Sequence, residues 1–199
     1  MIKKNQFYIK NLKNVVFLGQ SDYFLDYIKI NNSLKLKTII ITSSDQSKFI
    51  DKKIKFKVFD NLDQKFRKFI LKNVKIENTI FISLAARNIF KKDTIKKFFL
   101  NNLINFHGTR LPLDAGGGGF SWKIMREDRI DNQLVHLIDQ GIDTGPIIDN
   151  HLSLYPNNCQ IPKDFENYRY KKFIEFYSKV LKKIKNGFVF DLKHQINYL

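Results

Sequence analysis

The chain has 199 residues and a formal net charge of +16, from 35 Lys and Arg against 19 Asp and Glu. That length suits one well-buried domain and is too short for two of full size. No apolar run approaches the roughly 20 residues of a membrane helix, and the basic N-terminus lacks the apolar segment of a secretory signal. A single cysteine, Cys159, excludes an internal disulfide and a cysteine metal cluster. We therefore expect a cytoplasmic protein with no membrane partner.

The positive charge has two explanations. It suits a protein that binds nucleic acid or another polyanion. It also suits a genome rich in A and T, because Lys, Ile and Asn dominate the chain and the lysines are scattered along it. We favour the second explanation and do not expect nucleic acid as the partner. A positive field would still favour an anionic small-molecule substrate.

Strand and helix patterns alternate through the first half of the chain. Apolar, β-branched strand patterns lie at 14–19, 36–44, 54–60, 78–86 and 103–107, and helical spacing of apolar residues lies at 22–31, 61–73 and 93–102. This alternation predicts the α/β class, with a mostly parallel twisted sheet and helices on both faces. Sites in such sheets lie at the carboxyl ends of the strands.

The second half of the chain has a different character. All four prolines lie beyond residue 111, and four consecutive glycines occupy 116–119. A strand pattern follows at 134–139, and a long basic and aromatic helix is predicted at roughly 164–186. We expect a catalytic core over 1–156 and a C-terminal helical segment, 157–199, packed on the same domain.

Three polar residues suggest chemistry in this second half. Asn105 and His107 end the last strand pattern two residues apart, so both point to one face of the sheet while Phe106 points to the other. Asp143 follows in a turn bracketed by glycines. Acyl transfer to an amine requires such a set, because an amide and an imidazole stabilise the oxyanion of a tetrahedral intermediate. The imidazole and the carboxylate then manage the proton of the amine.

The pattern around these residues resembles the folate-dependent formyltransferase family. In that family N-x-H precedes a small hydroxyl residue, Leu-Pro, a Gly-containing loop, a helix with a Trp, and a D-x-G-[IL]-D-T-G-x-[IL] segment. The resemblance is dense over 103–149 and weaker over 14–100. The matching residues here are Asn105, His107, Thr109, Leu111, Pro112, Gly116, Gly117, Gly118, Gly119, Trp122 and 139–147.

The resemblance implies a Rossmann-like formyltransferase fold and N10-formyltetrahydrofolate as the formyl donor, with no metal. It implies that Asn105, His107 and Asp143 are catalytic, and that Asp143 raises the pKa of His107 above its reference of about 6.5. For the folate it implies two loops, with the residues Leu84, Arg87, Asn88, Ile89, Phe90, Ile138, Asp139 and Gly141. For the acceptor we expect Thr109, Arg110, Gly117 and Gly118, with Arg110 standing where the family usually has an apolar residue.

The acceptor amine divides the family into branches. A tRNA-directed member is expected to carry a further C-terminal domain, and a purine-synthesis member a phosphate-binding turn where this chain has Gly19-Gln20-Ser21. The remaining branch formylates nucleotide-linked 4-amino-4,6-dideoxy sugars for surface polysaccharides such as lipopolysaccharide. We expect such an acceptor and a possible homodimer. The alternatives are glycinamide ribonucleotide or another small amine, and a catalytically silent relative that binds folate or RNA.

The remaining candidates have structural alternatives. The Gly116–Gly119 loop fits no nucleotide phosphate motif and is either a connection or a loop against substrate. Phe120 and Trp122 are expected in the core rather than stacked on a ligand. Arg110 is either a phosphate contact or a surface charge. His136 is expected to be structural.

Overall fold

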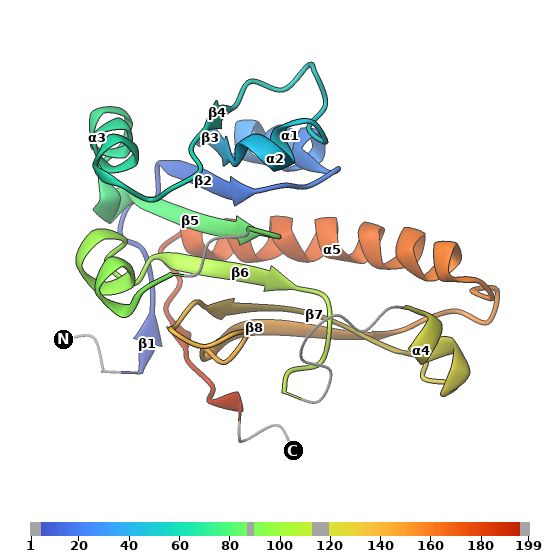
Figure 1. Cartoon of the computed structure of the whole chain (residues 1–199). Coiled ribbons are helices and arrows are strands. Elements are labelled where there is room, and N and C mark those ends of the chain that lie inside the picture. Colours follow the sequence, from blue (N-terminus) through green and yellow to red (C-terminus); the bar gives the residue numbers. More distant parts are fainter. Residues whose placement is uncertain (1–4, 87–89, 113–119, 196–199) are drawn as a thin grey trace.

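The computed structural model describes residues 5–86, 90–112 and 120–195. Its elements are shown in Figure 1. The strands are β1 (Gln6–Phe7), β2 (Asn14–Gly19), β3 (Lys37–Thr42), β4 (Lys57–Val58), β5 (Thr79–Leu84), β6 (Leu103–His107), β7 (Ile130–Leu137), β8 (Ile147–Leu154) and β9 (Phe190–Asp191). The helices are α1 (Phe24–Ser33), α2 (Ser44–Ser47), α3 (Gln64–Asn73), η1 (Ile76–Asn78), η2 (Thr94–Phe98), α4 (Phe120–Met125) and α5 (Pro162–Lys185).

The main sheet has seven strands in the order β4-β3-β2-β5-β6-β7-β8. The strands from β4 to β6 are parallel, whereas β7 pairs antiparallel with β6 and with β8. A second sheet joins the two ends of the chain, because β1 pairs antiparallel with β9. The prediction of an α/β fold with a mostly parallel sheet is therefore confirmed, and the antiparallel strands at one edge are an addition to it.

Most predicted elements occur within two or three residues of the expected bounds. The pattern at 14–19 and that at 103–107 became β2 and β6 without change. The strand predicted at 54–60 is reduced to two residues, because Ile54 is buried in the core while both residues of β4 are exposed. Strand β8 was not predicted: only Ile147 and Ile148 are buried, and its outer half is an exposed edge.

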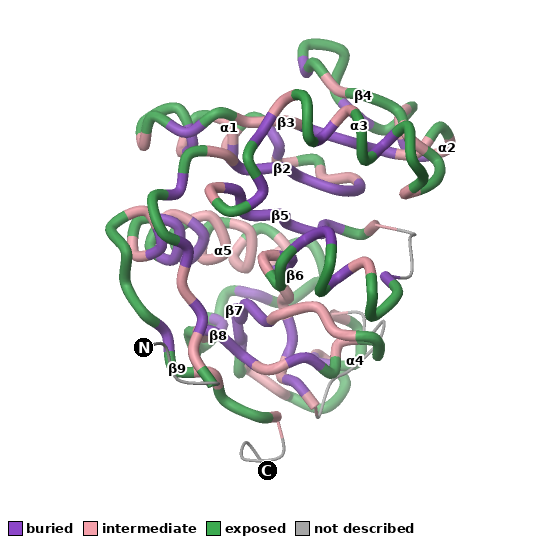
Figure 2. The backbone as a smooth tube through the Cα atoms, turned by 90° about the vertical axis from the view of Figure 1, so that its left-hand side faces the viewer, coloured by how far each residue is buried: buried purple, intermediate pink, exposed green. Residues whose placement is uncertain are grey.

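Helices cover both faces of the sheet. Because successive side chains of a strand point to opposite faces, alternate residues of the parallel strands pack against different layers of helices. In β2, Val15 and Phe17 join the layer with α1 and α5, whereas Val16 and Leu18 join the layer with α3 and η2. Figure 2 shows the central strands as almost continuously buried. The run NVVFLG is apolar without alternation for this reason.

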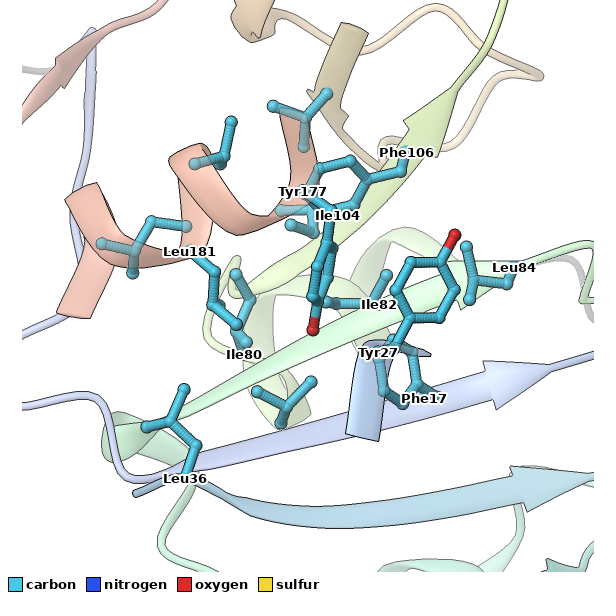
Figure 3. Close-up of a cluster of buried hydrophobic side chains, with 14 of the residues drawn as sticks. Phe17, Tyr27, Leu36, Ile80, Ile82, Leu84, Ile104, Phe106, Tyr177 and Leu181 are labelled. Carbon is cyan, nitrogen blue, oxygen red and sulfur yellow. The ribbon is translucent and has the colours of Figure 1, made fainter. Parts of the chain in front are cut away.

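Helix α5 packs along the first of these layers, and its aromatic residues reach the centre of it (Figure 3). Pro162 begins the helix, and the Asp164 carboxylate accepts hydrogen bonds from the backbone of Gln160 and Ile161. Tyr177 is buried beside Phe17, with the two ring centroids 6.3 Å apart. The expected C-terminal segment thus shares the core of the first part of the chain.

We expect Tyr177→Phe to lower the free energy of unfolding by about 1–3 kcal/mol. The Tyr177 hydroxyl donates to the Asn31 side-chain oxygen at 2.6 Å, and Asn31 is itself fully buried. Removing the hydroxyl leaves that oxygen buried without its donor. Urea unfolding would measure the change, with Tyr168→Phe as the control, because Tyr168 is half-buried on the same helix. Equal stabilities of both variants and the parent would contradict this account.

In the part of the chain that the structure describes, no helix has the length and apolar character that crossing a bilayer requires.

Candidate active site

The carboxyl end of β6 presents the predicted pair to one face. Asn105 and His107 line a cavity, while the Phe106 ring packs into the core, 5.2 Å from the Tyr177 ring and 6.0 Å from that of Phe176. This is the two-residue alternation that the sequence predicted.

The antiparallel partner β7 contributes His136, which was expected from the sequence to be a structural residue. His136 pairs in register with Asn105, so their side chains lie side by side. Its Nε2 is 3.3 Å from the Asn105 amide nitrogen and 3.5 Å from the Asp143 carboxylate. His136 is buried, as expected of a structural residue, but it also belongs to the site. Its place seven residues before Asp143, on the strand that enters the same loop, was the available signal.

Asn105 ties the cluster together. His136 Nδ1 donates to the Leu137 carbonyl oxygen at 2.8 Å, and its Nε2 faces both the Asn105 amide nitrogen and Asp143 Oδ1, at 3.3 and 3.5 Å. The Asn105 amide nitrogen donates to Asp143 Oδ1 at 3.3 Å. The Asn105 amide is therefore held with its nitrogen toward the carboxylate.

His107 is placed to exchange a proton. Its Nδ1 lies 3.9 Å from Asp143 Oδ1, and its Nε2 is buried and has no hydrogen-bond partner among the described residues. Burial lowers the pKa of His107 below 6.5; Asp143 opposes this shift, while His136 and Arg169 add to it. Asp143 acts on the pKa of His107 in the expected direction, but the expected net increase is wrong, because desolvation outweighs the carboxylate.

The Asp143 carboxyl is held in its charged form. Its pKa is lowered, first by its contact with the His136 ring and further by His107 and the Asn105 amide, against the opposing effect of burial. The backbone of Asp143 is in the left-handed region, with φ of 54°. The Gln195 side chain donates to the carbonyl oxygens of Asp143 and Gly145, at 2.7 and 2.9 Å, and so fixes this turn from outside.

The cluster borders a cavity of about 550 Å³, a size that suits a small organic ligand. One wall is the loop from Ile138 to Asp143, and the other carries Ala85, Ala86 and Phe90. Apolar walls with a few polar groups suit a flat heterocycle. The Asp139 carboxylate accepts hydrogen bonds from Gly141 N and Thr144 Oγ1, which shape the loop. Of the predicted folate-binding residues, Phe90, Ile138, Asp139 and Gly141 line this cavity.

Other predicted residues lie elsewhere. Leu84 packs in the core and is not part of the lining. Arg87, Asn88, Ile89, Gly117, Gly118 and the rest of the glycine loop lie outside the described residues. Thr109 is buried beyond the strand.

The side chains around the acceptor segment also differ from expectation. Arg110 forms an ion pair with Asp128 at 2.5 Å, and Lys123 shares that carboxylate at 3.2 Å. Trp122 is 57% exposed and carries Arg126 over its ring, so its prediction as a core residue is wrong. Phe120 packs partly buried against the small cluster around Phe165.

Metal ligation is a separate question. His107, His136 and Asp143 offer three ligand atoms within 4.8 Å of one another, a grouping that the spacing along the sequence did not indicate. However, the Asn105 amide nitrogen lies between two of them and donates to Asp143. An N–H donor in that position opposes a cation, so we assign no metal to the cluster.

We expect Gly145→Ala to destabilise the protein by roughly 1–3 kcal/mol, as overpacking does. A Cβ at Gly145 would lie 1.8 Å from the Leu137 carbonyl oxygen, where the loop returns to β7. Gly187→Ala is the control, because a Cβ there meets nothing within 4 Å. This variant therefore measures only the cost of placing Ala at a positive φ. Thermal unfolding of both variants would show the difference. A smaller loss for Gly145→Ala than for Gly187→Ala would contradict the close approach.

No protein-family model matches the chain. Two curated relatives do. The methionyl-tRNA formyltransferase of Campylobacter lari is 24% identical over 155 residues, 70% of this chain and 50% of the relative. The phosphoribosylglycinamide formyltransferase of Bacillus subtilis is 30% identical over 87 residues, 42% of this chain and 43% of the relative. The chain thus spans about half the length of the curated relatives it matches.

Solved structures resemble the whole fold. A 4-N formyltransferase from Francisella tularensis has a TM-score of 0.71 at 19% identity, over 94% of this chain and 74% of its own. A formyltransferase from Anoxybacillus kamchatkensis, in complex with UDP-4,6-dideoxy-4-formamido-L-AltNAc and tetrahydrofolate, has a TM-score of 0.60 at 22% identity (91% and 79%). The phosphoribosylglycinamide formyltransferase of Bacillus halodurans has a TM-score of 0.64 at 16% identity (86% and 95%).

The chain has the formyltransferase fold, and the family resemblance of its sequence is confirmed by relatives that are themselves formyltransferases.

Proposed function

We propose that the protein transfers a formyl group from N10-formyltetrahydrofolate to a primary amine, the amine of a nucleotide-linked 4-amino-4,6-dideoxy sugar, in the cytoplasm. The observation that carries the proposal is the convergence of Asn105, His107 and Asp143 at one cavity. The cavity supplies a slot for the donor, and the three side chains supply hydrogen-bond donors and a proton acceptor beside it.

The protonation state of His107 determines whether it donates or accepts a proton during the reaction. With its pKa lowered by burial, His107 is uncharged at neutral pH, and Nε2 has no partner within the described part of the chain. It can therefore accept the proton that the amine loses on attacking the formyl carbon. The imidazolium that forms is stabilised by Asp143, and the Asn105 amide can donate to the developing oxyanion. The imidazolium can then give its proton to N10 as the bond between the formyl carbon and N10 breaks and tetrahydrofolate leaves.

The sugar acceptor is supported by two features. Neighbours with this fold include the Francisella tularensis 4-N formyltransferase and the Anoxybacillus kamchatkensis protein bound to a formamido sugar nucleotide. The turn after β2 also offers little to a phosphate: the Gln20 amide donates to the Leu84 carbonyl at 2.8 Å. Gly19 is required there because a Cβ would lie 2.1 Å from that same oxygen.

Glycinamide ribonucleotide is the second candidate. It is supported by the extent of the structural similarity, because this chain covers 95% of the Bacillus halodurans phosphoribosylglycinamide formyltransferase. Both candidates use the same chemistry and differ in the group that carries the amine.

The test is formyl transfer by the purified protein from N10-formyltetrahydrofolate, with products identified by mass. The acceptors are dTDP- and UDP-linked 4-amino sugars, glycinamide ribonucleotide and methionyl-tRNA. Formylation of one sugar nucleotide supports the proposal, and formylation of glycinamide ribonucleotide supports the second candidate. Release of formate without any acceptor product would contradict transfer to an amine. Folate binding or salt-dependent RNA binding without turnover would indicate a silent relative.

A further inference from the structure

A buried polar cluster lies next to the catalytic histidine. Asp131, at the start of β7, is fully buried and accepts hydrogen bonds from the Tyr155 hydroxyl at 2.5 Å and from Arg169 Nε at 2.9 Å. Gln133 donates to its second oxygen. Arg169 comes from α5, so the cluster joins the long helix to the antiparallel edge of the sheet.

The Arg169 guanidinium is fixed in position but only partly used. Its central carbon Cζ lies 4.4 Å from the centroid of the Phe120 ring. Its hydrogen bonds, to Asp131 and Tyr155, are both made by Nε. Nη2 is enclosed by protein and has no partner, and no described residue accepts from Nη1. Burying a cationic donor without acceptors is costly, and such groups are rare in folded proteins.

The unused side of this guanidinium is close to the active site. Gly108 directly follows His107, and a Cβ on Gly108 would lie 3.2 Å from Arg169 Cδ and 3.5 Å from Nη1. The bare backbone of Gly108 thus lets the guanidinium lie against the end of β6. The positive charge is near enough to His107 to contribute to the lowering of its pKa.

We propose that Arg169 Nη1, the guanidinium nitrogen beside Gly108, binds an anionic oxygen of the acceptor substrate, a phosphate or a carboxylate, and so holds its amine beside His107. This assignment rests on the proposed function for the identity of the acceptor, but not for the existence of an anion site. A guanidinium held in place by Asp131, Tyr155 and Phe120 presents Nη1 to such a group with little loss of side-chain freedom. The Asp131 charge offsets that of Arg169 while the site is empty.

Arg129 provides a matched control. It also lies over a ring, that of Phe165, at 5.3 Å, but Nη1 and Nη2 already donate to the carbonyl oxygens of Cys159 and Pro156 at 2.7 and 3.0 Å. Two arginines in the same part of the fold therefore differ in whether their Nη groups are occupied. Arg129→Met removes a cation and a ring contact without removing the proposed site.

The first experiment needs no turnover. Inorganic phosphate and acetate are titrated against the parent and against Arg169→Met, Arg169→Lys and Arg129→Met, at constant ionic strength, with calorimetry and the thermal midpoint as readouts. We expect saturable phosphate binding by the parent and by Arg129→Met, and about 10- to 100-fold weaker binding by Arg169→Met, as the loss of a charge-assisted pair predicts. Phosphate binding stronger than acetate binding would identify a phosphoryl group, and the reverse a carboxylate.

Arg169→Lys keeps the charge but not the planar fork, and it serves if Arg169→Met does not fold. Undiminished anion binding by either folded Arg169 variant overturns the proposal. With an acceptor in hand, we expect Arg169→Lys to raise the acceptor KM about tenfold, with little change in kcat or in the KM of the formyl donor. Arg169-dependent phosphate binding without formyl transfer would keep the anion site and reject the proposed function. Formyl transfer by Arg169→Lys with an unchanged acceptor KM would support the proposed function and reject the anion site.

Discussion

Replacing His107 by Asn will lower kcat for formyl transfer by about 10² to 10⁴, the usual contribution of a positioned acid or base. Asn fits the space and retains a donor, but it cannot accept the proton of the attacking amine. The His107 side chain lines the cavity, and its Nε2 has no hydrogen-bond partner in the described structure, so this nitrogen is available for a proton. The measurement is single-turnover formylation of the acceptor found in the panel.

Asp143→Asn should cause a loss of the same order by a different route. The carboxylate accepts from Asn105 and lies 3.5 Å from His136 Nε2 and 3.9 Å from His107 Nδ1. An amide there cannot stabilise the imidazolium. His151→Asn, on the exposed part of β8, is the control for losing a histidine far from the cluster. Normal turnover in folded His107→Asn would refute the assignment of the base, and a drop shared by His151→Asn would point to a general defect.

The central fold was predictable because burial on both faces leaves a strong sequence signal. NVVFLG and LINFH are apolar runs that end at the site, and the two-residue alternation in the second correctly placed the Phe106 ring in the core, opposite the side chains of Asn105 and His107. The edges were less predictable. Strand β8 is half exposed and lacks a hydrophobic alternation, whereas the alternating pattern at 54–60 overstated β4, which has only two exposed residues.

Within the site, pairing between distant strands decided what the sequence could not. His136 faces Asn105 through the β6–β7 register, and Arg169 on α5 approaches Gly108 although the two residues are far apart in the sequence. The position of His136 before the Asp143 loop was a weak signal for the first approach, and no local pattern indicates the second. The direction of the His107 pKa shift could not be predicted from the sequence. The motif indicated that Asp143 is a neighbour of His107, but it did not indicate how deeply the His107 ring is buried.

The second large effect concerns pH. We expect kcat/KM to fall tenfold per pH unit on the acid side, with an apparent pKa below 6.5, because His107 must be uncharged to accept the amine proton. Burial is the main cause of the lowered pKa, with His136 and Arg169 adding to it and Asp143 opposing it. The same group affects stability. As pH falls from about 6.5, the unfolded chain takes up this proton before the folded chain does, so the free energy of unfolding decreases.

Asp143 adds to this acid sensitivity at lower pH. Its folded pKa is also lowered, so the stability it contributes is lost as pH falls through that folded value. The two groups are separable. His107→Asn should flatten the dependence of stability on pH between neutral pH and the folded pKa of His107, while leaving the loss at lower pH.

The His107 ring signal in an NMR titration, assigned by its absence in His107→Asn, would measure the pKa directly. Asp143→Asn removes the one influence that raises the pKa, so the titration should move to still lower pH. Asp149→Asn is the matched control, because its carboxylate pairs with Lys183 at 2.7 Å and is not among the groups that shift His107. A His107 titration above 6.5 in the parent would mean that Asp143 outweighs burial. The histidine would then act first as a charged hydrogen-bond donor, and the acid limb of the rate would have to arise from protonation of the acceptor amine.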